Sequence, residues 1–234
     1  MANILLIETA TQVCSVAIAS DGNILSIRES HDQRSHSALI TSFVAEVLND
    51  ASIEFSQIDA VAVSKGPGSY TGLRIGVSTA KGICFALDKP LLAVGTLESM
   101  TKGFLEAYKN EITEHDLLCP MIDARRMEVY TALFDDVGNM IQPTEAKIID
   151  EDSFNDLLNA HRIWLFGDGA QKCKSSFSDK NNVLIVEDFN PSAAHLSQLA
   201  EIRFQLGDAE DLAYFEPFYL KEFIAGLPKV KGLH

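Results

Sequence analysis

Two segments of this chain share one layout, and this internal repeat constrains the fold more than any single motif. In residues 4–25 an apolar run leads to acidic Glu8, and a strand-like run then ends at a turn that contains Gly22. In residues 119–141 a similar run leads to Asp123, and the next strand-like run ends at a turn that contains Gly138. Asp-Gly and Gly-Asn turns between such runs are typical of β-hairpins. The repeat predicts two tandem α/β domains, and coincidence between two unrelated hairpins is the alternative.

The rest of the chain fits this plan. Apolar residues recur at helical spacing in residues 35–50 and 71–87, and residues 97–109 and 193–206 also resemble helices. Residues 91–94 form a short strand-like run, and residues 109–116 are polar and acidic. We expect a first domain at residues 1–108 and a second at 109–215. A tail at residues 216–234 is expected to pack back on the first domain.

A glycine-rich loop stands between the strand-like residues 60–63 and the helical pattern that begins near residue 71. A strand, a glycine loop and a helix in this order can aim backbone N–H groups at an anion. Glycine also lets two backbone segments approach closely. The loop is no Walker motif, because no Gly-Lys-Ser/Thr closes it. An anion cradle and a tight structural turn are both open interpretations.

The residue sequence of this loop closely resembles the signature of the TsaB (YeaZ) family. Four further blocks, at residues 4–10, 123–130, 167–169 and 216–221, also resemble that family. The loop reads Gly66-Pro67-Gly68-Ser69-Tyr70-Thr71-Gly72-Leu73-Arg74-Ile75-Gly76. The resemblance implies the fold of the actin-like ATPase superfamily, in which two ribonuclease-H-like domains flank a nucleotide cleft.

The resemblance also implies a function in making tRNA threonylcarbamoyladenosine. In that pathway TsaD transfers the threonylcarbamoyl group to the adenosine beside the anticodon, and TsaB is its non-catalytic paralogue and partner. The ATPase TsaE joins the two, TsaB alone forms a homodimer, and tRNA is reached only through the complex. The family pairs through helices of the first domain, where an exposed apolar patch would mark an interface. The expected interface residues are Leu39, Phe43, Val47, Leu73 and Val77.

The superfamily places phosphate-handling carboxylates where this chain has Glu8 and Asp123. The resemblance implies nucleotide contacts at Glu8, Thr9, Asp123, Arg125, Gly167 and Gly169. The glycines that follow each carboxylate in the superfamily are missing here, since residues 9–11 and 124–126 have side chains. We therefore expect no required cofactor and at most weak ATP or ADP binding. A stand-alone ATPase or small-molecule kinase that uses Glu8 and Asp123 is the alternative function, and a carboxylate paired with a neighbouring arginine is the structural alternative.

Metal and protease chemistry lack the residues they need. TsaD holds a metal with two histidines four residues apart, and the matching positions here are Thr96 and Met100, which suit no such ion. Gly68 to Gly72 is not a Gly-x-Ser-x-Gly motif, and no HExxH is present. We predict no metal site and no protease activity.

Charge and cysteine content set the remaining expectations. The net charge is −14 without a Lys/Arg run, so the chain alone should bind RNA phosphates poorly. Four cysteines without a CxxC pair fit a reducing, cytoplasmic compartment. No apolar run approaches the roughly 18 to 20 residues of a membrane span, and no secretory signal is expected.

Overall fold

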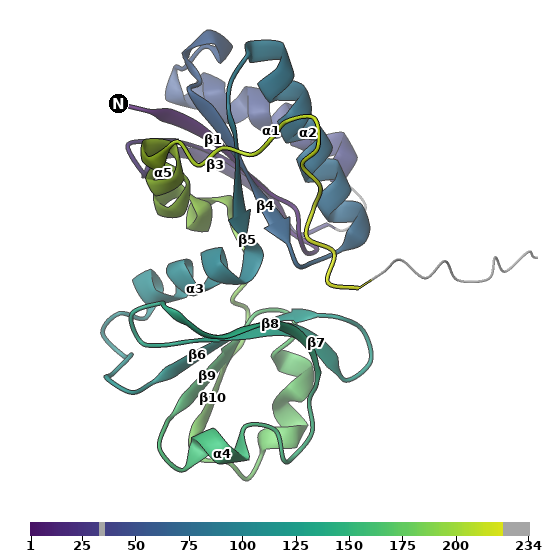
Figure 1. The fold of residues 1–234 in the computed structure, drawn as a ribbon, viewed down its shortest axis with the longest axis vertical. Helices are drawn as coiled ribbons and strands as arrows, with labels where there is room; N and C mark the ends of the chain where they lie inside the picture. The colour runs from purple at the N-terminus through teal and green to yellow at the C-terminus, as the bar shows by residue number, and fades with distance from the viewer. Residues whose placement is uncertain (33–35, 222–234) are drawn as a thin grey trace, which may run out of the picture.

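Two five-stranded sheets with the same strand order make up the computed structural model, which describes residues 1–32 and 36–221 (Figure 1). The first sheet has the order β3-β2-β1-β4-β5 and the second has the matching order β8-β7-β6-β9-β10. In both sheets the first three strands of the chain are antiparallel, and the last two run parallel to the first. The duplicated α/β architecture predicted from the repeat is confirmed. The strands are β1 Asn3–Glu8, β2 Cys14–Ser20, β3 Asn23–Ser30, β4 Ala60–Gly66, β5 Leu91–Gly95, β6 Leu117–Asp123, β7 Glu128–Phe134, β8 Met140–Ile148, β9 Ile163–Phe166 and β10 Val183–Val186.

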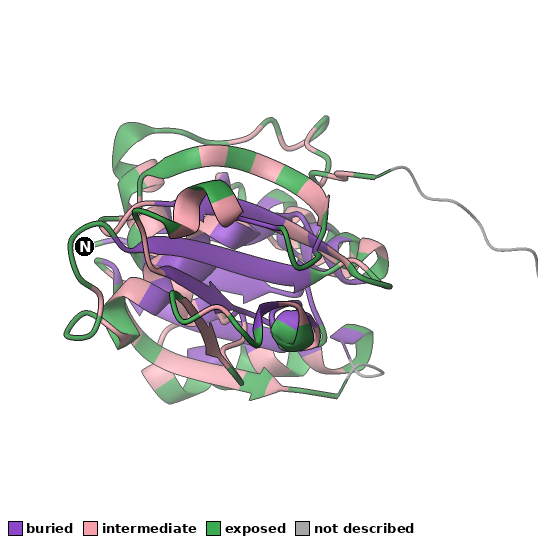
Figure 2. Ribbon diagram, turned by 90° about the horizontal axis from the view of Figure 1, so that it is seen from below, coloured by how far each residue is buried: buried purple, intermediate pink, exposed green. Residues whose placement is uncertain are grey.

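Helices cover both faces of the first sheet. One face packs against α1 (His36–Ala51) and α2 (Tyr70–Leu87) through residues such as Leu5 and Ile7 of β1. The opposite face, which carries Ile4 and Leu6, packs against η3 (Ala193–Leu196) and α5 (Ser197–Leu206). Because both faces are buried, β1 and β4 are continuous apolar runs without alternation. Figure 2 shows the buried residues concentrated in these central strands.

The second sheet is covered in the same way by different segments. The helix α3 (Thr96–Ala107) lies on one face, where the Phe104 ring stacks on Phe166 with centroids 3.9 Å apart. The other face packs against α4 (Asn155–Leu158) and η2 (Gln171–Phe177). One more short helix, η1 (Phe55–Gln57), precedes β4.

The two domains exchange a helix, which differs from the expected boundary at residue 108. α3 follows the first sheet in the chain but contributes its apolar face to the core of the second. η3 and α5 follow the second sheet but pack on the first. The two crossing segments meet closely, since a Cβ atom on Gly103 of α3 would lie 2.2 Å from the His195 ring of η3. Packing therefore assigns α3 to the second domain and residues 193–206 to the first.

The chain then runs back past α1 and α2 to the gap between the domains (Figure 1). The Lys81 ammonium of α2 donates to the Ala213 and Phe215 carbonyl oxygens at 3.3 and 3.1 Å. The Phe218 N–H donates to the Lys65 carbonyl oxygen at 2.7 Å. Phe218 and Tyr219 of the predicted tail thus lie against the first domain, whereas Lys221 contacts Glu128 of β7 in the second domain. The remainder of that tail, 222–234, lies outside the described residues.

Candidate functional site

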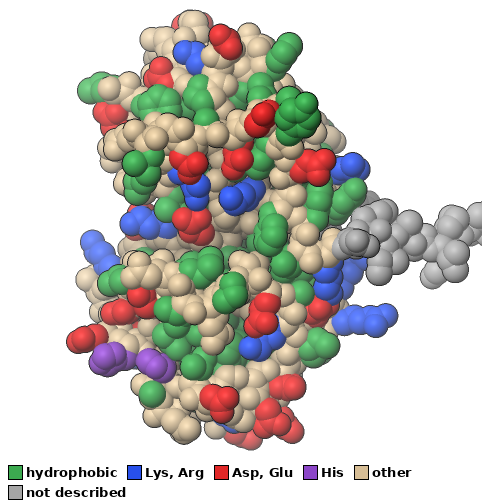
Figure 3. Space-filling model, viewed as in Figure 1, with side chains coloured by type: hydrophobic (Ala, Val, Ile, Leu, Met, Phe, Trp, Pro, Cys, Tyr) green, Lys and Arg blue, Asp and Glu red, His purple; other side chains and the backbone are tan. Residues whose placement is uncertain are grey.

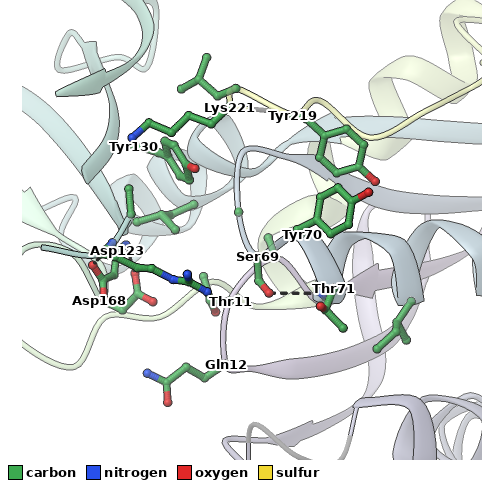
Figure 4. A pocket seen from close by; sticks show the side chains of 18 of the residues that line it. Thr11, Gln12, Ser69, Tyr70, Thr71, Asp123, Tyr130, Asp168, Tyr219 and Lys221 are labelled. Carbon is green, nitrogen blue, oxygen red and sulfur yellow. Dashed lines mark hydrogen bonds between the residues drawn. The ribbon is translucent and has the colours of Figure 1, made fainter. Parts of the chain in front are cut away.

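A cleft of about 720 Å³ lies between the two domains (Figure 4). Its first-domain wall comes from the loop after β1 and from the first residues of α1 and α2, and its second-domain wall comes from the end of β6 and from Asp168. Tyr219 and Lys221 of the tail lie at its rim. The lining residues are Ala10, Thr11, Gln12, His36, Ser37, Gly68, Ser69, Tyr70, Thr71, Gly72, Ile75, Ile122, Asp123, Ala124, Arg125, Tyr130, Asp168, Tyr219, Leu220 and Lys221.

The signature loop starts α2 at the cleft. Ser69 is the N-cap of the helix, and its hydroxyl accepts the Gly72 N–H at 3.3 Å. The Ser69 N–H donates to the Ala10 carbonyl oxygen at 2.6 Å, which ties the start of α2 to the loop after β1. At the C-terminal end of this loop, the Arg74 guanidinium lies over the Tyr70 ring, and the Tyr70 ring also contacts the Tyr219 ring of the tail in a tilted arrangement, with centroids 4.8 Å apart. The loop residues Gly66 and Pro67 are joined by a cis peptide bond.

Close packing inside the chain explains the glycines of the signature loop. A Cβ atom on Gly68 would lie 2.4 Å from the Ala10 carbonyl oxygen, and one on Gly72 would lie 2.1 Å from the Thr9 carbonyl oxygen. A Cβ atom on Gly66 would lie 2.6 Å from the Phe218 carbonyl oxygen. Distances this short leave no room for a side chain. The structural-turn interpretation therefore accounts for these glycines, because three backbone segments converge here.

Glu8 does not face the cleft, contrary to the expectation from the superfamily. Its side chain is fully buried, and Oε1 accepts the Ala10 N–H at 2.6 Å and the Ser64 hydroxyl at 2.8 Å. Oε2 has no hydrogen-bond partner among the described residues. Burial raises the pKa of this carboxyl to about 7 despite those hydrogen bonds. The neighbouring Thr9 is also buried and donates its hydroxyl to the Gly72 carbonyl oxygen at 2.9 Å. Thr9 therefore holds α2 against the end of β1, whereas Glu8 joins β4 to the loop after β1.

Asp123 does line the cleft, but its charge is already paired. Its carboxylate contacts the Lys172 ammonium and accepts the Arg125 N–H at 2.9 Å. Lys172 also donates to the Glu128 carbonyl oxygen at 2.6 Å. Lys172 thus pairs with the carboxylate that stands where the superfamily was expected to place a phosphate-handling group. No sequence pattern singled out Lys172, because it approaches Asp123 only through the packing of η2 beneath β6.

In the glycine turn at residues 167–169, Asp168 lines the cleft and the two glycines do not. Gly167 has a φ of +103°, and a Cβ atom there would lie 2.3 Å from the Met121 carbonyl oxygen. A Cβ atom on Gly169 would lie 2.9 Å from the Ile122 carbonyl carbon. Both glycines pack on the backbone of β6 and are not among the cleft-lining residues, contrary to the expected contacts. Asp168 between them accepts the Asp123 N–H at 2.9 Å, and burial raises the pKa of its carboxyl.

The chain is similar to known proteins in both sequence and structure. The family model described as TsaD, tRNA N6-adenosine threonylcarbamoyltransferase, matches residues 24–221. The tRNA threonylcarbamoyladenosine biosynthesis protein TsaB of Escherichia coli strain K12 is 31% identical over 232 residues, which cover 95% of this chain and 96% of that protein. The chain belongs to the TsaB family. YeaZ from Pseudomonas aeruginosa has a TM-score of 0.78 at 26% identity, covering 94% of this chain and 100% of that one.

A more distant structure supports the fold alone. The activator of the 2-hydroxyisocaproyl-CoA dehydratase from Clostridium difficile, solved with bound ADPNP, has a TM-score of 0.50 at 7% identity. It covers 89% of this chain and 98% of its own chain. The predicted class of two tandem ribonuclease-H-like domains of the actin-like ATPase superfamily is confirmed.

The helices that TsaB proteins were expected to use for pairing are only partly available at the surface. Val47, Leu73 and Val77 are buried in the core of the first domain, so they cannot form an interface in the folded chain. Leu39 and Phe43 are half-buried on α1. Helical periodicity placed the five residues on related faces, but the apolar stripe is wide enough to include the core side.

The positions that match the metal ligands of TsaD also lie in the interior. Thr96 and Met100 are both fully buried, at the start of α3 and one turn later. Within residues 1–32 and 36–221, no group of three or more His, Cys, Asp and Glu side chains is placed to hold a metal ion. The described part of the chain also contains no helix long and apolar enough to cross a membrane.

Proposed function

We propose that this chain is the non-catalytic partner subunit of TsaD. Family membership gives it a role in tRNA threonylcarbamoyladenosine biosynthesis, and the finer assignment concerns what it does there. In this role the chain binds TsaD through α1 and α2, TsaE joins the pair, and the chain alone forms a homodimer through the same face. The role requires no nucleotide.

The proposal rests on the outer face of α2, and in particular on Gly82. Gly82 is exposed in the middle of the helix, and a Cβ atom there would meet nothing within 4 Å. Glycine inside a helix costs about 1 kcal/mol relative to alanine. Gly72 and Gly76 are explained by their contacts with Thr9, whereas no contact inside the described chain explains Gly82. Close approach of a helix from another protein would explain it.

The surroundings of Gly82 also suit a protein partner. Phe85, one turn further along α2, has a side chain that is 82% exposed. Ile75 lies on the same helix toward the cleft and is half-buried. An exposed phenylalanine beside a glycine offers an apolar anchor next to a flat helix surface. Leu39 and Phe43 are half-buried on the neighbouring helix α1.

Transfer RNA is reached through the complex in this proposal. On the face shown in Figure 3, Lys and Arg side chains are interspersed with Asp and Glu, and the described residues form no continuous basic stripe there. A surface of mixed charge gives little of the counterion release that drives binding to RNA phosphates. TsaD would therefore supply most of the contact with tRNA.

The alternative of a stand-alone ATPase or kinase has little support. Glu8 is buried away from the cleft, and the Asp123 carboxylate is held by Lys172. Neither group is free to manage a magnesium ion or an attacking water. Saturable ATP turnover by the pure protein, abolished by Asp123→Asn, would revive this alternative.

The decisive experiment mixes the protein with TsaD from the same source and measures the mass by size-exclusion chromatography with light scattering. We expect a one-to-one heterodimer to replace a homodimer. Gly82→Arg should weaken the complex at least about tenfold, because a long charged side chain would separate the helices. The matched control is Ile202→Arg, an exposed position on α5 at the opposite face of the same sheet, which should bind normally. Unchanged binding by Gly82→Arg would exclude this face, and absence of any complex would refute the role.

A further inference from the structure

The tail after α5 follows the first domain over most of its described length. The Glu210 N–H donates to the Leu91 carbonyl oxygen of β5 at 2.9 Å. Further along, the Lys81 ammonium of α2 holds the carbonyl oxygens of Ala213 and Phe215. The tail is thus fixed to the first domain before it reaches the mouth of the cleft, where its last described residues line the cavity.

The signature loop forms the seat for the end of the tail. The Phe218 N–H donates to the Lys65 carbonyl oxygen at 2.7 Å, and a Cβ atom on Gly66 would lie 2.6 Å from the Phe218 carbonyl oxygen. The Tyr219 ring then contacts the Tyr70 ring at the start of α2. Glycine at position 66 therefore lets the backbone of the tail approach the backbone of the loop.

Beyond this seat the tail reaches the second domain. Lys221 forms an ion pair with the carboxylate of Glu128, the first residue of β7. The Lys221 side chain is 44% exposed and the Glu128 side chain is 23% exposed, so the pair is partly shielded from solvent ions. Figure 4 shows the Lys221 side chain pointing toward the wall that carries Tyr130, whereas Tyr219 lies beside Tyr70 on the opposite wall. One short segment therefore touches both walls of the cleft.

The other covalent links between the domains lie elsewhere. Within the described residues the chain crosses from one domain to the other between β5 and α3 and again between β10 and η3. These two crossings meet where Gly103 packs on the His195 ring. In Figure 1 the tail comes down beside α2 on the right, whereas α3 extends to the left. Two domains that are joined at one place can rotate about that joint as rigid bodies, and a contact away from the joint limits the rotation.

We propose that residues 216–221 are a strap, which the signature loop anchors and the Lys221–Glu128 ion pair fastens across the mouth of the cleft. The strap limits how far the two domains open and so controls how readily a molecule enters the cavity. Lys221 and Glu128 act as positioning residues, because their contact sets the separation of the two walls. This role also explains why the signature loop needs Gly66, and it does not rest on the role proposed for the α2 face.

The test measures the distance between the domains of the full chain by double electron–electron resonance. The four native cysteines are buried, so spin labels can be directed to two introduced ones. Ser42→Cys on α1 and Ser175→Cys on η2 place the labels at exposed positions in different domains. Labelled protein is diluted with unlabelled protein, so that only distances within one chain contribute. We expect a single narrow distance distribution while the strap is intact.

Lys221→Gln and Glu128→Gln should each raise the population with the longer interdomain distance about threefold, which is the scale expected for a partly exposed ion pair. Exchange of the two charges, Lys221→Glu with Glu128→Lys, should restore the narrow distribution, since the pair forms again in reverse. Lys147→Gln is the matched control. It breaks an ion pair of similar exposure with Glu145 that lies within β8, so the distance distribution should not change.

Tyr219→Ala tests the seat of the strap. Without its ring contact to Tyr70 the end of the tail should detach, and the population with the longer distance should rise as it does in Lys221→Gln. Circular dichroism should show every variant folded, since none of these side chains belongs to a core. The proposal is overturned if Lys221→Gln and Glu128→Gln keep the distribution of the unmodified protein, or if exchange of the charges fails to restore it. It is equally overturned if Tyr219→Ala leaves the distribution unchanged.

Discussion

Glu8→Gln is expected to make the protein more stable at pH 7.5 and to leave its stability unchanged at pH 4.5. Burial raises the pKa of the Glu8 carboxyl from 4.5 to about 7. Below pH 4.5 the carboxyl is protonated in both the folded and the unfolded chain, so its contribution is fully present there. As the pH rises toward 7 the unfolded chain releases this proton first, and folding stability is lost over that interval. Above about pH 7 both states are ionised and the loss is complete.

The expected size of this effect is about 3 kcal/mol, since each pKa unit corresponds to about 1.4 kcal/mol. The measurement is the free energy of unfolding of both proteins by urea denaturation at several pH values between 4.5 and 8. Glutamine keeps an oxygen for the Ala10 N–H and the Ser64 hydroxyl and imitates the protonated acid. The difference between the two proteins should therefore grow with pH and level off near pH 7.5.

Glu106→Gln is the matched control for this prediction, because Glu106 is exposed on α3 and its side chain is 60% accessible. Its stability should track that of the unmodified protein at every pH. A difference between Glu8→Gln and the unmodified protein that stays constant with pH would show that the carboxyl is ionised in the folded chain. A 13C NMR titration of the Glu8 carboxyl provides a direct reading of the same pKa.

Gly72→Ala is expected to destabilise the protein by about 3 kcal/mol, at the upper end of the usual cost of overpacking. The added Cβ atom would lie 2.1 Å from the Thr9 carbonyl oxygen, so either α2 or the loop after β1 must move. Neither can move freely, since the Thr9 hydroxyl and the Ser69 N–H hold them together. For a chain of this length the midpoint of thermal unfolding should fall by on the order of 10 °C.

Gly82→Ala in the same helix is the control, and it should change stability in the opposite direction. In the monomer its Cβ atom would meet open space, so the substitution should stabilise the helix by about 1 kcal/mol. Thermal denaturation of the two variants beside the unmodified protein, followed by circular dichroism at concentrations low enough to dissociate the proposed homodimer, checks both signs. Equal and small effects would mean that α2 does not rest on the Thr9 backbone as the structure shows.

The contacts of Glu8 and Asp123 explain why the nucleotide-site roles expected from the superfamily did not carry over to these two residues. The pattern located Glu8 and Asp123 at corresponding strand ends, and the structure has them there. It did not reveal that a serine and an N–H group enclose one carboxylate, or that Lys172 neutralises the other. Ser64 and Lys172 come from β4 and η2, so their positions depend on packing between segments far apart in the chain.

The sequence by itself determined the repeated fold, most helix and strand positions and the family. Hydrophobic periodicity and turn residues are local properties that can be read along the chain. Because the same layout occurs twice, the interpretation of each half strengthened the interpretation of the other. The tertiary structure alone decided the exchange of α3 and α5 between the domains, the burial of Val47, Leu73 and Val77, and the convergence of His36 with the start of α2. Those outcomes depend on which face of each helix meets which sheet. A wide apolar stripe does not specify that choice, because the same side chains can serve a core or an interface.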